Sequence, residues 1–365
     1  MIAKEEIQNE LKRNSEECLK GKKKVKNKKF KVLKRILITF MILIIVGIGT
    51  LTFLLYGPIN TFRDWLITTA MTTMNHQYLA TWFYSDETIA EVMSRNRVIE
   101  IEETTNPDLI NETIAVEYAN EYEKAILEKA GNEDYKIIEI KGDTYSGYLA
   151  VIYDPSRVKT VITNRIGSSG QYLVDMAKNN NALVAINGGG FDDPNYNSTG
   201  GSPLGITISD GKLITNHPYG STGGLIGFDN NNVLVLGKMN YQKAQQLGIR
   251  DAVTCGPFLI VNGKSSEVLG NGGWGDAPRS AIGQRADGIV LFLALDGRRV
   301  GMPGADMNDL IQIMENYGAI NAANLDGGTS TAMVVNGELI NDPINGNGAH
   351  KTRPIPTGFA LIANE

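Results

Sequence analysis

The sequence predicts an α+β protein in which a single-pass N-terminal transmembrane helix precedes a mixed, mostly antiparallel sheet domain with helices. Two observations carry this prediction. A long stretch near the N-terminus is apolar and uncharged, and from Gly142 onward short runs rich in β-branched residues alternate with turn signals. Of the 40 glycines, 35 lie from Gly142 onward without a fixed period, which indicates tight turns rather than a fibrous repeat. Helices combined with antiparallel strands define the α+β class.

The apolar stretch has the length of a membrane span. No charged residue occurs from Ile36 to Phe62, and Ile36–Tyr56 is almost wholly apolar. About 20 helical residues cross a hydrocarbon core of roughly 30 Å. A buried core helix of this length would keep a polar face, and a cleavable signal peptide would have about 7–15 apolar residues before a small-residue site. We therefore expect residues 36–56 to be an uncleaved anchor.

The flanking charges predict the orientation of this anchor. The Lys-rich run Lys20–Arg35 directly precedes it, whereas only Arg63 and Asp64 follow it closely. The positive-inside rule places residues 1–35 in the cytoplasm and the C-terminal domain outside the cell membrane. Residues 1–35 carry a balance of +8 and the remaining 330 residues a balance of −13. We therefore expect no nucleic-acid partner, and we attribute the basic run to topology and anionic lipid.

Residues 57–141 are expected to form a stalk and a helical region that leads into a domain of residues 142–365. Ser85 before DETIAEVM is a helix N-cap signal, and Ala115–Ala130 has helical spacing of its apolar side chains. The acidic, proline-bearing stretch of residues 100–108 lies between them and is expected to be a linker.

Local signals place hairpins and helices within the domain. Asp-Gly or Asn-Gly between alternating apolar runs favours the type I′ turn of a hairpin, and such dipeptides occur at Asp210-Gly211, Asn262-Gly263 and Asn336-Gly337. Two helices are expected, at Gly170–Asn180 and Met307–Tyr317. Each is followed by an apolar strand, Ala182–Gly188 and Ala322–Gly328. The two cysteines, Cys18 and Cys255, lie on opposite sides of the anchor, so no intramolecular disulfide is expected.

Four glycine-containing loops beside strands are the candidates for a binding site. Each combines small residues with one polar group: Asn187–Phe191, Cys255–Pro257, Pro278–Gly283 and Leu325–Thr331. Glycine lets backbone N–H groups approach a ligand closely and form an anion-binding nest. None of the loops matches a phosphate-binding GxxxxGK[ST] or a GxGxxG pattern, and glycine loops of this kind can also serve only as turns.

These blocks together resemble a known family. The order AINGGGF, SPLGITISDGKLI, CGPFLIVNGK, PRSAIGQ, LALDGR and NLDGGTSTAMVVNGELI is similar to that of the phosphodiester glycosidase family, over about Gly142–Asn364. The resemblance implies hydrolysis of a sugar–O–P linkage at the anomeric carbon, with release of a phosphomonoester. It also implies a bacterial, membrane-anchored type associated with exopolysaccharide.

The resemblance gives three polar residues candidate catalytic roles. Arg279 can meet phosphate oxygens in a bidentate fork, or instead tie a loop to a carboxylate or to carbonyls. Asp326, at the exit of an apolar strand, can stabilise positive charge, attack the anomeric carbon or activate water, or instead cap its loop. Asp296 is the second candidate carboxylate, although Asp-Gly after a strand is also ordinary turn chemistry.

Substrate contacts are expected from the glycine loops. They are Asn187, Gly188, Gly189, Gly256, Gly327, Gly328, Thr329, Ser330 and Thr331, which offer an amide, hydroxyls and backbone N–H groups. No GxSxG occurs, and His217 and His350 lie in turn-like contexts without HExxH spacing, which argues against a serine hydrolase and a zinc enzyme. No cofactor is expected. Asp192, Asp193 and Asn195 could bind calcium, but a solvated turn is the preferred interpretation.

The sequence therefore predicts an extracytoplasmic, membrane-anchored glycosidase that hydrolyses a sugar-phosphodiester linkage in a cell-envelope or exopolysaccharide glycan. The alternative is a non-catalytic glycan-binding or exopolysaccharide assembly module, which acidic balance and glycine loops fit equally. The sugar, the anomer and the oligomeric state stay open.

Overall fold

The computed structural model describes residues 2–72, 76–110, 118, 120–129, 131–193, 198–218, 223–345 and 348–364. The chain divides into two compact units, Met1–Arg63 and Asp64–Glu365. All the strands belong to the second unit.

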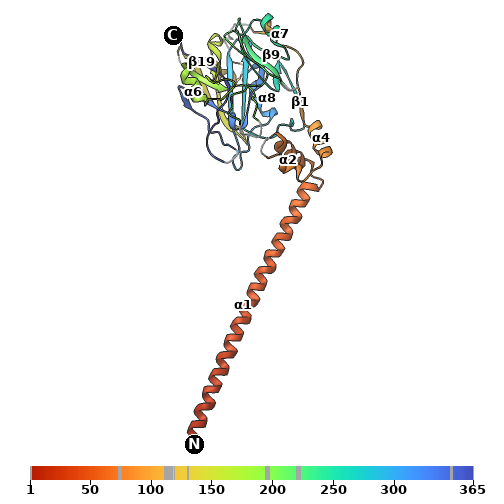
Figure 1. Ribbon diagram of the computed structural model, residues 1–365, viewed down its shortest axis with the longest axis vertical. Coiled ribbons are helices and arrows are strands. Elements are labelled where there is room, and N and C mark those ends of the chain that lie inside the picture. The colour runs from red at the N-terminus through yellow and green to blue at the C-terminus, as the bar shows by residue number, and fades with distance from the viewer. Residues whose placement is uncertain are drawn as a thin grey trace. The chain divides into compact units, whose positions relative to one another are not determined.

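The first unit consists mainly of one long helix, α1 (Ile2–Tyr56), which is coloured red to orange in Figure 1. Its stretch Phe30–Tyr56 is long and apolar enough to cross a membrane, with a mean hydropathy of 2.6. The Lys-rich run belongs to the same continuous helix. An N-terminal apolar helix of this kind is compatible with a signal-anchor or with a signal peptide, and its orientation stays a prediction.

Short helices follow along the chain: α2 (Asn60–Thr72), α3 (Tyr78–Thr81), α4 (Asp86–Arg95) and α5 (Glu121–Leu127). The predicted cap of α4 is confirmed, because Ser85 Oγ accepts a hydrogen bond of 3.3 Å from Thr88 N. The expected helix at Ala115–Ala130 lies partly outside the described residues, and its described part is α5, capped by Asn120.

The stretch of residues 100–108 is not a free linker. It follows strand β1 (Arg97–Ile99), which pairs with β13 (Glu267–Leu269), and it includes the 3-10 helix Pro107–Leu109. Thr105 N donates to Leu236 O at 3.1 Å, and the Glu100 carboxylate accepts from Phe258 N at 2.8 Å. These partners are more than 100 residues away in the sequence, so local composition could not reveal them.

In the described residues the other strands form three sheets, and each pairing is antiparallel. The seven-stranded sheet has the order β12-β11-β16-β14-β15-β3-β2. Its strands are β2 (Tyr135–Lys141), β3 (Ser146–Ile152), β11 (Phe258–Val261), β12 (Lys264–Ser265), β14 (Arg279–Arg285), β15 (Val290–Asp296) and β16 (Ala319–Asn324). Its edge strand β2 precedes Gly142, where the domain was expected to begin.

Two five-stranded sheets complete the domain. One has the order β7-β6-β10-β8-β9, with β6 (Ile206–Ser209), β7 (Lys212–Asn216), β8 (Gly224–Asp229), β9 (Leu234–Gly237) and β10 (Ile249–Cys255). The other has the order β18-β17-β5-β19-β4, with β4 (Val158–Ile162), β5 (Ala182–Asn187), β17 (Met333–Val335), β18 (Glu338–Leu339) and β19 (Thr357–Ile362). The sheets and helices confirm the predicted α+β class.

The three hairpin predictions are confirmed. Asp210, Asn262 and Asn336 have φ of 47°, 55° and 50°, and each is followed by a glycine with positive φ. Positive φ at both central residues is the requirement of a type I′ turn, which asparagine, aspartate and glycine meet at low cost. These turns join β6 to β7, β11 to β12 and β17 to β18.

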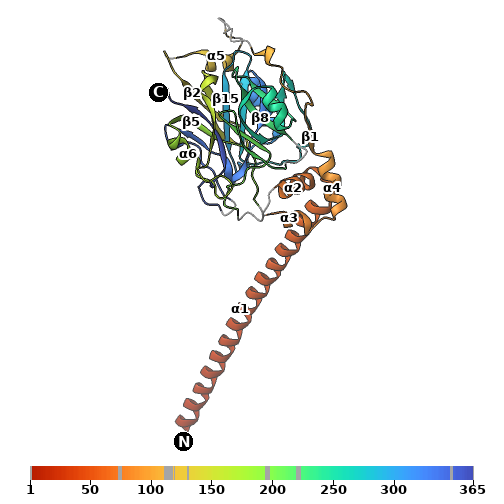
Figure 2. The same cartoon turned by 45° about the horizontal axis from the view of Figure 1, so that its top comes forward.

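The sheets enclose the main core, and helices cover their outer faces. Alternate residues of the strands point inward, and the main core includes Phe228, Phe258, Phe292 and Phe359, all at most 1% exposed. Helix α8 (Met307–Asn316) packs on the other face of the seven-stranded sheet, with Leu310 and Met314 fully buried. Helix α6 (Leu173–Asn179) covers the sheet that contains β5 (Figure 2), and α7 (Tyr241–Gln246) packs against β10. A further 3-10 helix, Pro155–Arg157, precedes β4.

Candidate active site

The four glycine-containing loops lie together at the ends of strands from all three sheets. Backbone and side-chain hydrogen bonds join them pairwise: Asp326 N to Gly188 O (3.0 Å), Gly190 N to Thr254 O (3.1 Å), Gly328 N to Pro278 O (2.8 Å) and Asn324 Nδ2 to Gly256 O (2.8 Å). The loops come from the ends of β5, β10 and β16 and the start of β14. Their convergence gathers the expected substrate-binding segments in one region.

Glycine is required where two of these loops touch. A Cβ at Gly189 would lie 2.4 Å from Thr254 O, and a Cβ at Gly327 would lie 2.8 Å from Pro278 O. Both distances are shorter than real Cβ contacts allow. The glycines that the motif supplies therefore permit the loops to pack backbone against backbone.

Asp326 occupies the centre of this region with few of its acceptor positions used. Among the described residues, its partners are Gly327 N, at 3.0 Å from Oδ1, and the Ser330 side chain. Asp326 as a residue is half-buried, and its carboxyl group is set deep among protein atoms. Burial raises the pKa of Asp326 to about 6, against the opposing effects of Ser330 and Arg353.

Two arginines that the sequence did not single out act on Asp326. Arg298 has a φ of 60° and donates from Nη1 to Thr329 Oγ1 at 2.9 Å and to Ile344 O at 3.2 Å. Its Nη2 lies 2.8 Å from the position of a Cβ on Gly328. The positive charge of Arg353 favours the ionised form of Asp326 and lowers its pKa. Within the described residues neither cation forms an ion pair with the Asp326 carboxylate: Arg298 bonds to Thr329 and Ile344, and Arg353 pairs with Asp193.

A second carboxylate, Asp193, accompanies Arg353. The Arg353 guanidinium pairs with Asp193 Oδ2 at 2.5 Å and lies 4.7 Å from the centre of the Phe191 ring. Burial opposes ionisation of Asp193, but hydrogen bonds from Arg353 and Ser198 outweigh it and hold its pKa below the ordinary value. The negative charge of Asp193 in turn raises the pKa of Asp326. The two carboxyls thus titrate at different pH values, as in acid–base pairs of active sites.

Arg279 is placed beside the Asp326 loop but is bonded to carbonyls. It is 5% exposed, and it donates from Nε to Ala305 O (3.2 Å) and from Nη2 to Trp274 O (2.7 Å) and Gly275 O (2.6 Å). Burial lowers its pKa to about 10. Its Cδ lies 3.9 Å from the position of a Cβ on Gly327. These contacts match the second interpretation of Arg279, a guanidinium that ties loops together.

The polar residues of the β5 and Asp326 loops are also engaged with one another. Asn187 is fully buried, donates from Nδ2 to Asp326 O at 2.6 Å, and accepts at Oδ1 from Ser280 Oγ and Ala332 N. Thr331 is fully buried, with no hydrogen-bond partner for its hydroxyl among the described residues. The amide of Asn187 therefore fixes the backbone at Asp326, and Thr329 is engaged by Arg298.

Asp296 lies at the same end of the seven-stranded sheet but has different neighbours. Its carboxylate accepts from Asn341 Nδ2 and Asp342 N, both at 2.9 Å, and burial raises its pKa. Asp296 and Asp342 also line a cavity of about 190 Å³ beside β2 and β3. Strands β16 and β15 are two places apart, with β14 between them, so their backbones are roughly 10 Å apart in the sheet. The structure does not bring Asp296 into the contacts of Asp326.

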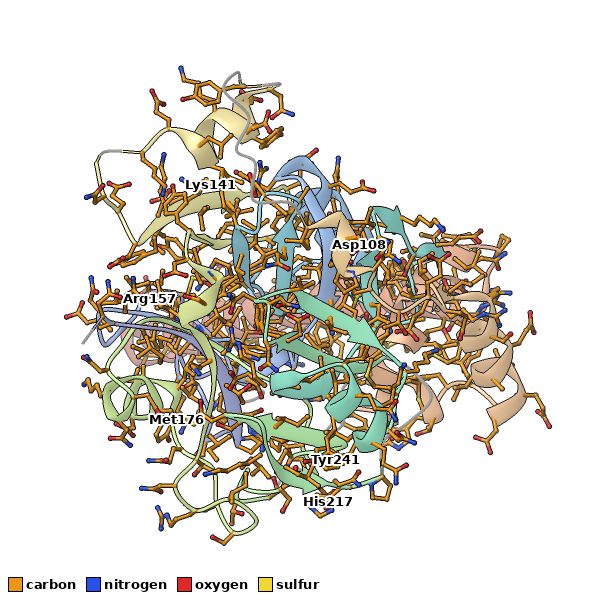
Figure 3. The ribbon with its side chains drawn as sticks, turned by 90° about the horizontal axis from the view of Figure 1, so that it is seen from above. Asp108, Lys141, Arg157, Met176, His217 and Tyr241 are labelled. Carbon is orange, nitrogen blue, oxygen red and sulfur yellow. The ribbon has the colours of Figure 1, made fainter. Side chains whose placement is uncertain are left out.

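The cysteine and the histidines of the domain do not add a nucleophile or a metal site to the Asp326 region within the described residues. The Cys255 thiol is buried near Asp326, and burial and that negative charge raise its pKa to about 12, so it stays neutral. His217 is exposed, at the edge of the domain in Figure 3, and His350 is exposed beside Asp342. No group of three or more His, Cys, Asp and Glu side chains that could hold a metal occurs within the described residues. Asn195, named for calcium with Asp192 and Asp193, lies outside them.

Comparison with known proteins identifies the family. Residues 180–362, half of the chain, match the sequence model of the family described as phosphodiester glycosidase. The chain therefore belongs to the phosphodiester glycosidase family, whose members are hydrolases, and the resemblance seen in its motifs is confirmed.

Two curated relatives and one solved structure agree. An uncharacterised SPbeta prophage-derived protein of Bacillus subtilis, YomE, is 29% identical over 202 residues, which cover 53% of this chain and 30% of YomE. The mouse N-acetylglucosamine-1-phosphodiester alpha-N-acetylglucosaminidase is 25% identical over 240 residues, covering 57% and 43%. The chain thus spans less than half the length of these relatives. The catalytic domain of the zebrafish N-acetylglucosamine-1-phosphodiester alpha-N-acetylglucosaminidase, auto-inhibited by its pro-peptide, shares the fold, with a TM-score of 0.54 and 23% identity over 65% of this chain and 86% of that one.

Sequence reasoning missed Arg298, Arg353 and Asp193 as neighbours of Asp326. Arg298 directly follows LALDG, in which Asp296 was the candidate residue. Arg353 lies in KTRPIP, which matches no known motif. The signal that could have found them is chemical: an anionic substrate needs exposed cations, and few arginines of the domain lie in loops next to the recognised blocks.

Proposed function

We propose that this protein hydrolyses a glycosyl phosphodiester, with Asp326 acting at the anomeric carbon and Arg298 and Arg353 neutralising the phosphate. The observation that carries the proposal is the carboxyl of Asp326, which lies near two arginines at the meeting point of four glycine loops and, among the residues that the structure describes, has acceptor positions left unfilled. Conformity with the family supports the reaction type.

The reaction breaks the bond between the anomeric carbon and the phosphate oxygen. The bonding electron pair leaves with the oxygen, a water oxygen bonds to the carbon, and the water proton is transferred to a base. The ionised carboxylate of Asp326 stabilises the positive charge that develops on the sugar and accepts that proton. A guanidinium stabilises the departing phosphate through paired hydrogen bonds, which is the role assigned to Arg298 and Arg353.

The remaining predicted site residues support this centre. Arg279 and Asn187 hold the backbone on either side of Asp326, because their polar groups are committed to carbonyls and to the loop itself. Gly188, Gly189, Gly256, Gly327 and Gly328 allow the close loop contacts, and Thr329, Ser330 and Thr331 offer hydroxyls beside the substrate. Asp296 secures the loop at Asn341 and Asp342. No cofactor is part of this mechanism, and addition of a chelator should leave the turnover rate unchanged.

The proposed setting is the outer face of a cell membrane, with a cell-envelope or exopolysaccharide glycan as the substrate. The apolar helix Phe30–Tyr56 and the preceding Lys-rich run support an anchor with a cytoplasmic N-terminus. Protease added to intact cells should then degrade the chain beyond about Arg63 and spare the first residues. Protection of the large domain would reverse the orientation.

The function is tested on the full-length protein in detergent. The probe is an N-acetylglucosaminyl phosphodiester, the substrate class named for the mouse relative, beside phosphodiesters of other sugars. We expect release of free sugar and phosphomonoester, and Asp326→Asn serves as the matched variant that should not turn over. Glycan binding without turnover across all sugars would instead support the non-catalytic binding or assembly module.

A further inference from the structure

The loop of residues 270–276, between β13 and β14, is pressed against the helices that follow the apolar span in the sequence. Its sequence GNGGWGD contains four glycines. A Cβ at Gly275, where φ is 58°, would lie 2.5 Å from Thr69 Oγ1 and 2.8 Å from Thr69 Cα. A Cβ at Gly273 would lie 2.1 Å from Asn96 O. The loop therefore adopts a conformation that only glycine permits at this distance from helix α2 and the end of helix α4.

Side chains of α2 also bond to this loop. The Thr72 hydroxyl has three carbonyl acceptors in reach, Thr68 O at 2.9 Å and Thr69 O at 3.2 Å in its own helix and Trp274 O of the loop at 3.2 Å, and its one proton is shared among them. Asn271 Nδ2 donates to Thr68 Oγ1 at 2.8 Å. Trp65 Nε1 donates to Asp276 Oδ2 at 3.2 Å. Three successive turns of one helix face thus hold one short loop that is about 200 residues away in the sequence.

The same loop holds Arg279. The carbonyl oxygens of Trp274 and Gly275 both accept from Arg279 Nη2, so Trp274 O is shared between Thr72 and the guanidinium. The stem of Arg279 lies beside Gly327, and the preceding Pro278 O accepts from Gly328 N at 2.8 Å. An unbroken series of contacts therefore runs from α2 through residues 274–279 to the loop that carries Asp326.

We propose that helix α2 is a positioning element of the active site, in which Thr72 and Thr68 set the 270–276 loop and, through Arg279 and Pro278, the Asp326 loop. Residues 64–72 belong on this proposal to the support of the site rather than to a passive stalk. The expected effect of α2 on turnover rests on the proposed function. The expected effect of α2 on the position of the Asp326 loop is independent of it.

The test uses the full-length protein and a variant that removes one hydroxyl. Thr72→Val keeps the shape of the side chain but loses the donor to Trp274 O, and Thr72→Ser restores it. Thr88→Val is the matched control, because Thr88 lies on α4 and its side chain contacts Ser85 and not the loop. Hydrogen exchange of peptides covering residues 325–331 reports the Asp326 loop directly. We expect faster exchange there in Thr72→Val, and wild-type exchange in Thr72→Ser and Thr88→Val.

Kinetics separate a positioning role from a general loss of stability. Thr72→Val should lower kcat about three- to tenfold with little change in KM, and this loss should largely disappear in an Arg279→Lys background, because both changes act through one contact series. Unchanged exchange over 325–331 in Thr72→Val would overturn the proposal. Absence of turnover in the wild-type protein would refute the proposed function, while the exchange result would still decide this inference.

Discussion

Two aspartates in this domain are buried beside arginines, and their surroundings differ in one respect. Asp251 lies in strand β10 and Asp326 in the loop after β16, and burial raises the pKa of both carboxyls. The acceptors of Asp251 are fully used by the protein. Those of Asp326 are only partly used by the residues that the structure describes.

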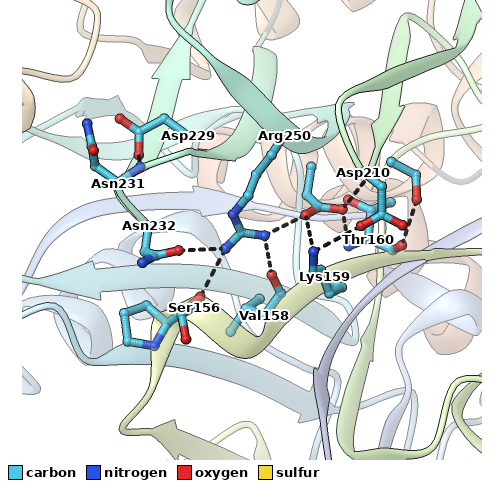
Figure 4. A network of polar contacts seen from close by, with 12 residues as sticks. Ser156, Val158, Lys159, Thr160, Asp210, Asp229, Asn231, Asn232 and Arg250 are labelled. Carbon is cyan, nitrogen blue, oxygen red and sulfur yellow. Dashed lines mark hydrogen bonds and ion pairs between the residues drawn. The ribbon is translucent and has the colours of Figure 1, made fainter.

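Asp251 ties two sheets together, and the polar network around its partners Arg250, Lys159 and Thr160 is shown in Figure 4. Its Oδ1 accepts from Thr160 N of β4 at 3.0 Å and from Asp210 N at 3.4 Å, and its Oδ2 pairs with the Arg250 guanidinium and lies 4.0 Å from Lys159 Nζ. Arg250 also donates to the carbonyl oxygens of Val158 and Pro155. Asp251 and Arg250 therefore each have several hydrogen-bond or ion-pair partners within the protein.

The comparison teaches how to separate a structural carboxylate from a functional one. Burial alone does not, because both are buried. A structural carboxylate has its acceptor positions filled by donors from the fold. Within the described residues, Asp326 is a half-buried residue whose carboxyl oxygens have acceptor positions left unfilled, and the nearby Arg298 and Arg353 are bonded to other groups. A buried carboxylate without enough hydrogen-bond donors costs folding free energy. Such a group is typical of a site where a bound ligand supplies the missing donors or positive charge.

The largest expected effect is on catalysis when Asp326 loses its charge. Asp326→Asn keeps the shape of the side chain and its hydrogen bond from Gly327 N, so the domain should stay folded. The value of kcat/KM should fall at least about a thousandfold, equivalent to about 4 kcal/mol of transition-state stabilisation. Near-wild-type turnover of the phosphodiester in a steady-state assay would show that Asp326 only caps its loop.

The same substitution at Asp251 should have the opposite profile. Asp251→Asn leaves Arg250 and Lys159 without their buried counter-charge, and breaking such a pair costs about 3 kcal/mol or more of unfolding free energy. Denaturant unfolding measures this loss, and kcat/KM per folded molecule should stay within about twofold of wild type. A catalytic defect at Asp251 with unchanged stability would remove the distinction between the two sites.

The elements of the fold that sequence reasoning found are those with local signals. The hairpins follow from an Asn-Gly or Asp-Gly pair. Helix α8 begins at Met307, as expected, and its N-cap Asp306 forms a capping box with Asp309. Asn187 and Asp326 were located because motif glycines surround them. Such signals depend on neighbours in the chain, so they can be detected without tertiary structure.

The contacts that were not foreseen are long-range and mostly made to backbone atoms. For Arg279 the sequence left two roles open, and the structure shows bonds to three carbonyl oxygens, which any residue could provide, so no sequence pattern could decide between the two roles. Glu100 accepts from Gly223 N and Phe258 N, which converts an expected linker into part of the domain. For Asp296 the sequence left a catalytic and a turn role open, because an Asp-Gly after a strand has the same local sequence in both roles.

A smaller effect is expected from replacing an arginine near Asp326 with lysine. Arg298→Lys keeps the charge but loses the planar fork, so kcat/KM should fall about tenfold, or about 1.4 kcal/mol, with little change in stability because the side chain is exposed. Arg299→Lys is the matched control, since the neighbouring Arg299 pairs with Asp342. Equal losses in the two variants would mean that Arg298 has no special contact with the substrate.

The smallest effect is the pH dependence that Asp326 imposes. With a pKa of about 6, its carboxylate is half ionised near that pH, so kcat/KM should be about half its plateau value there and decline further in acid. The charge of Arg353 lowers this pKa, so Arg353→Gln should move the inflection of the profile to higher pH.

The free energy of unfolding, measured as a function of pH, tests the raised pKa of Asp326 independently of kinetics. Because the folded-state pKa of Asp326 lies above the ordinary value of 3.8, its contribution to folding is fully present below that value and is lost as the pH rises through about 6. Asp326→Asn should therefore be more stable than wild type at neutral pH, by at most about 3 kcal/mol, and lose this advantage in acid. Denaturant unfolding at several pH values measures the difference. Burial raises the pKa of Asp251 as well, so the pH trend there has the same sign, but Asp251→Asn sets an NH2 donor against the Arg250 guanidinium in place of Oδ2 and so loses stability at each pH. A net gain at Asp326 and a net loss at Asp251 at neutral pH would therefore establish which carboxylate the fold itself requires.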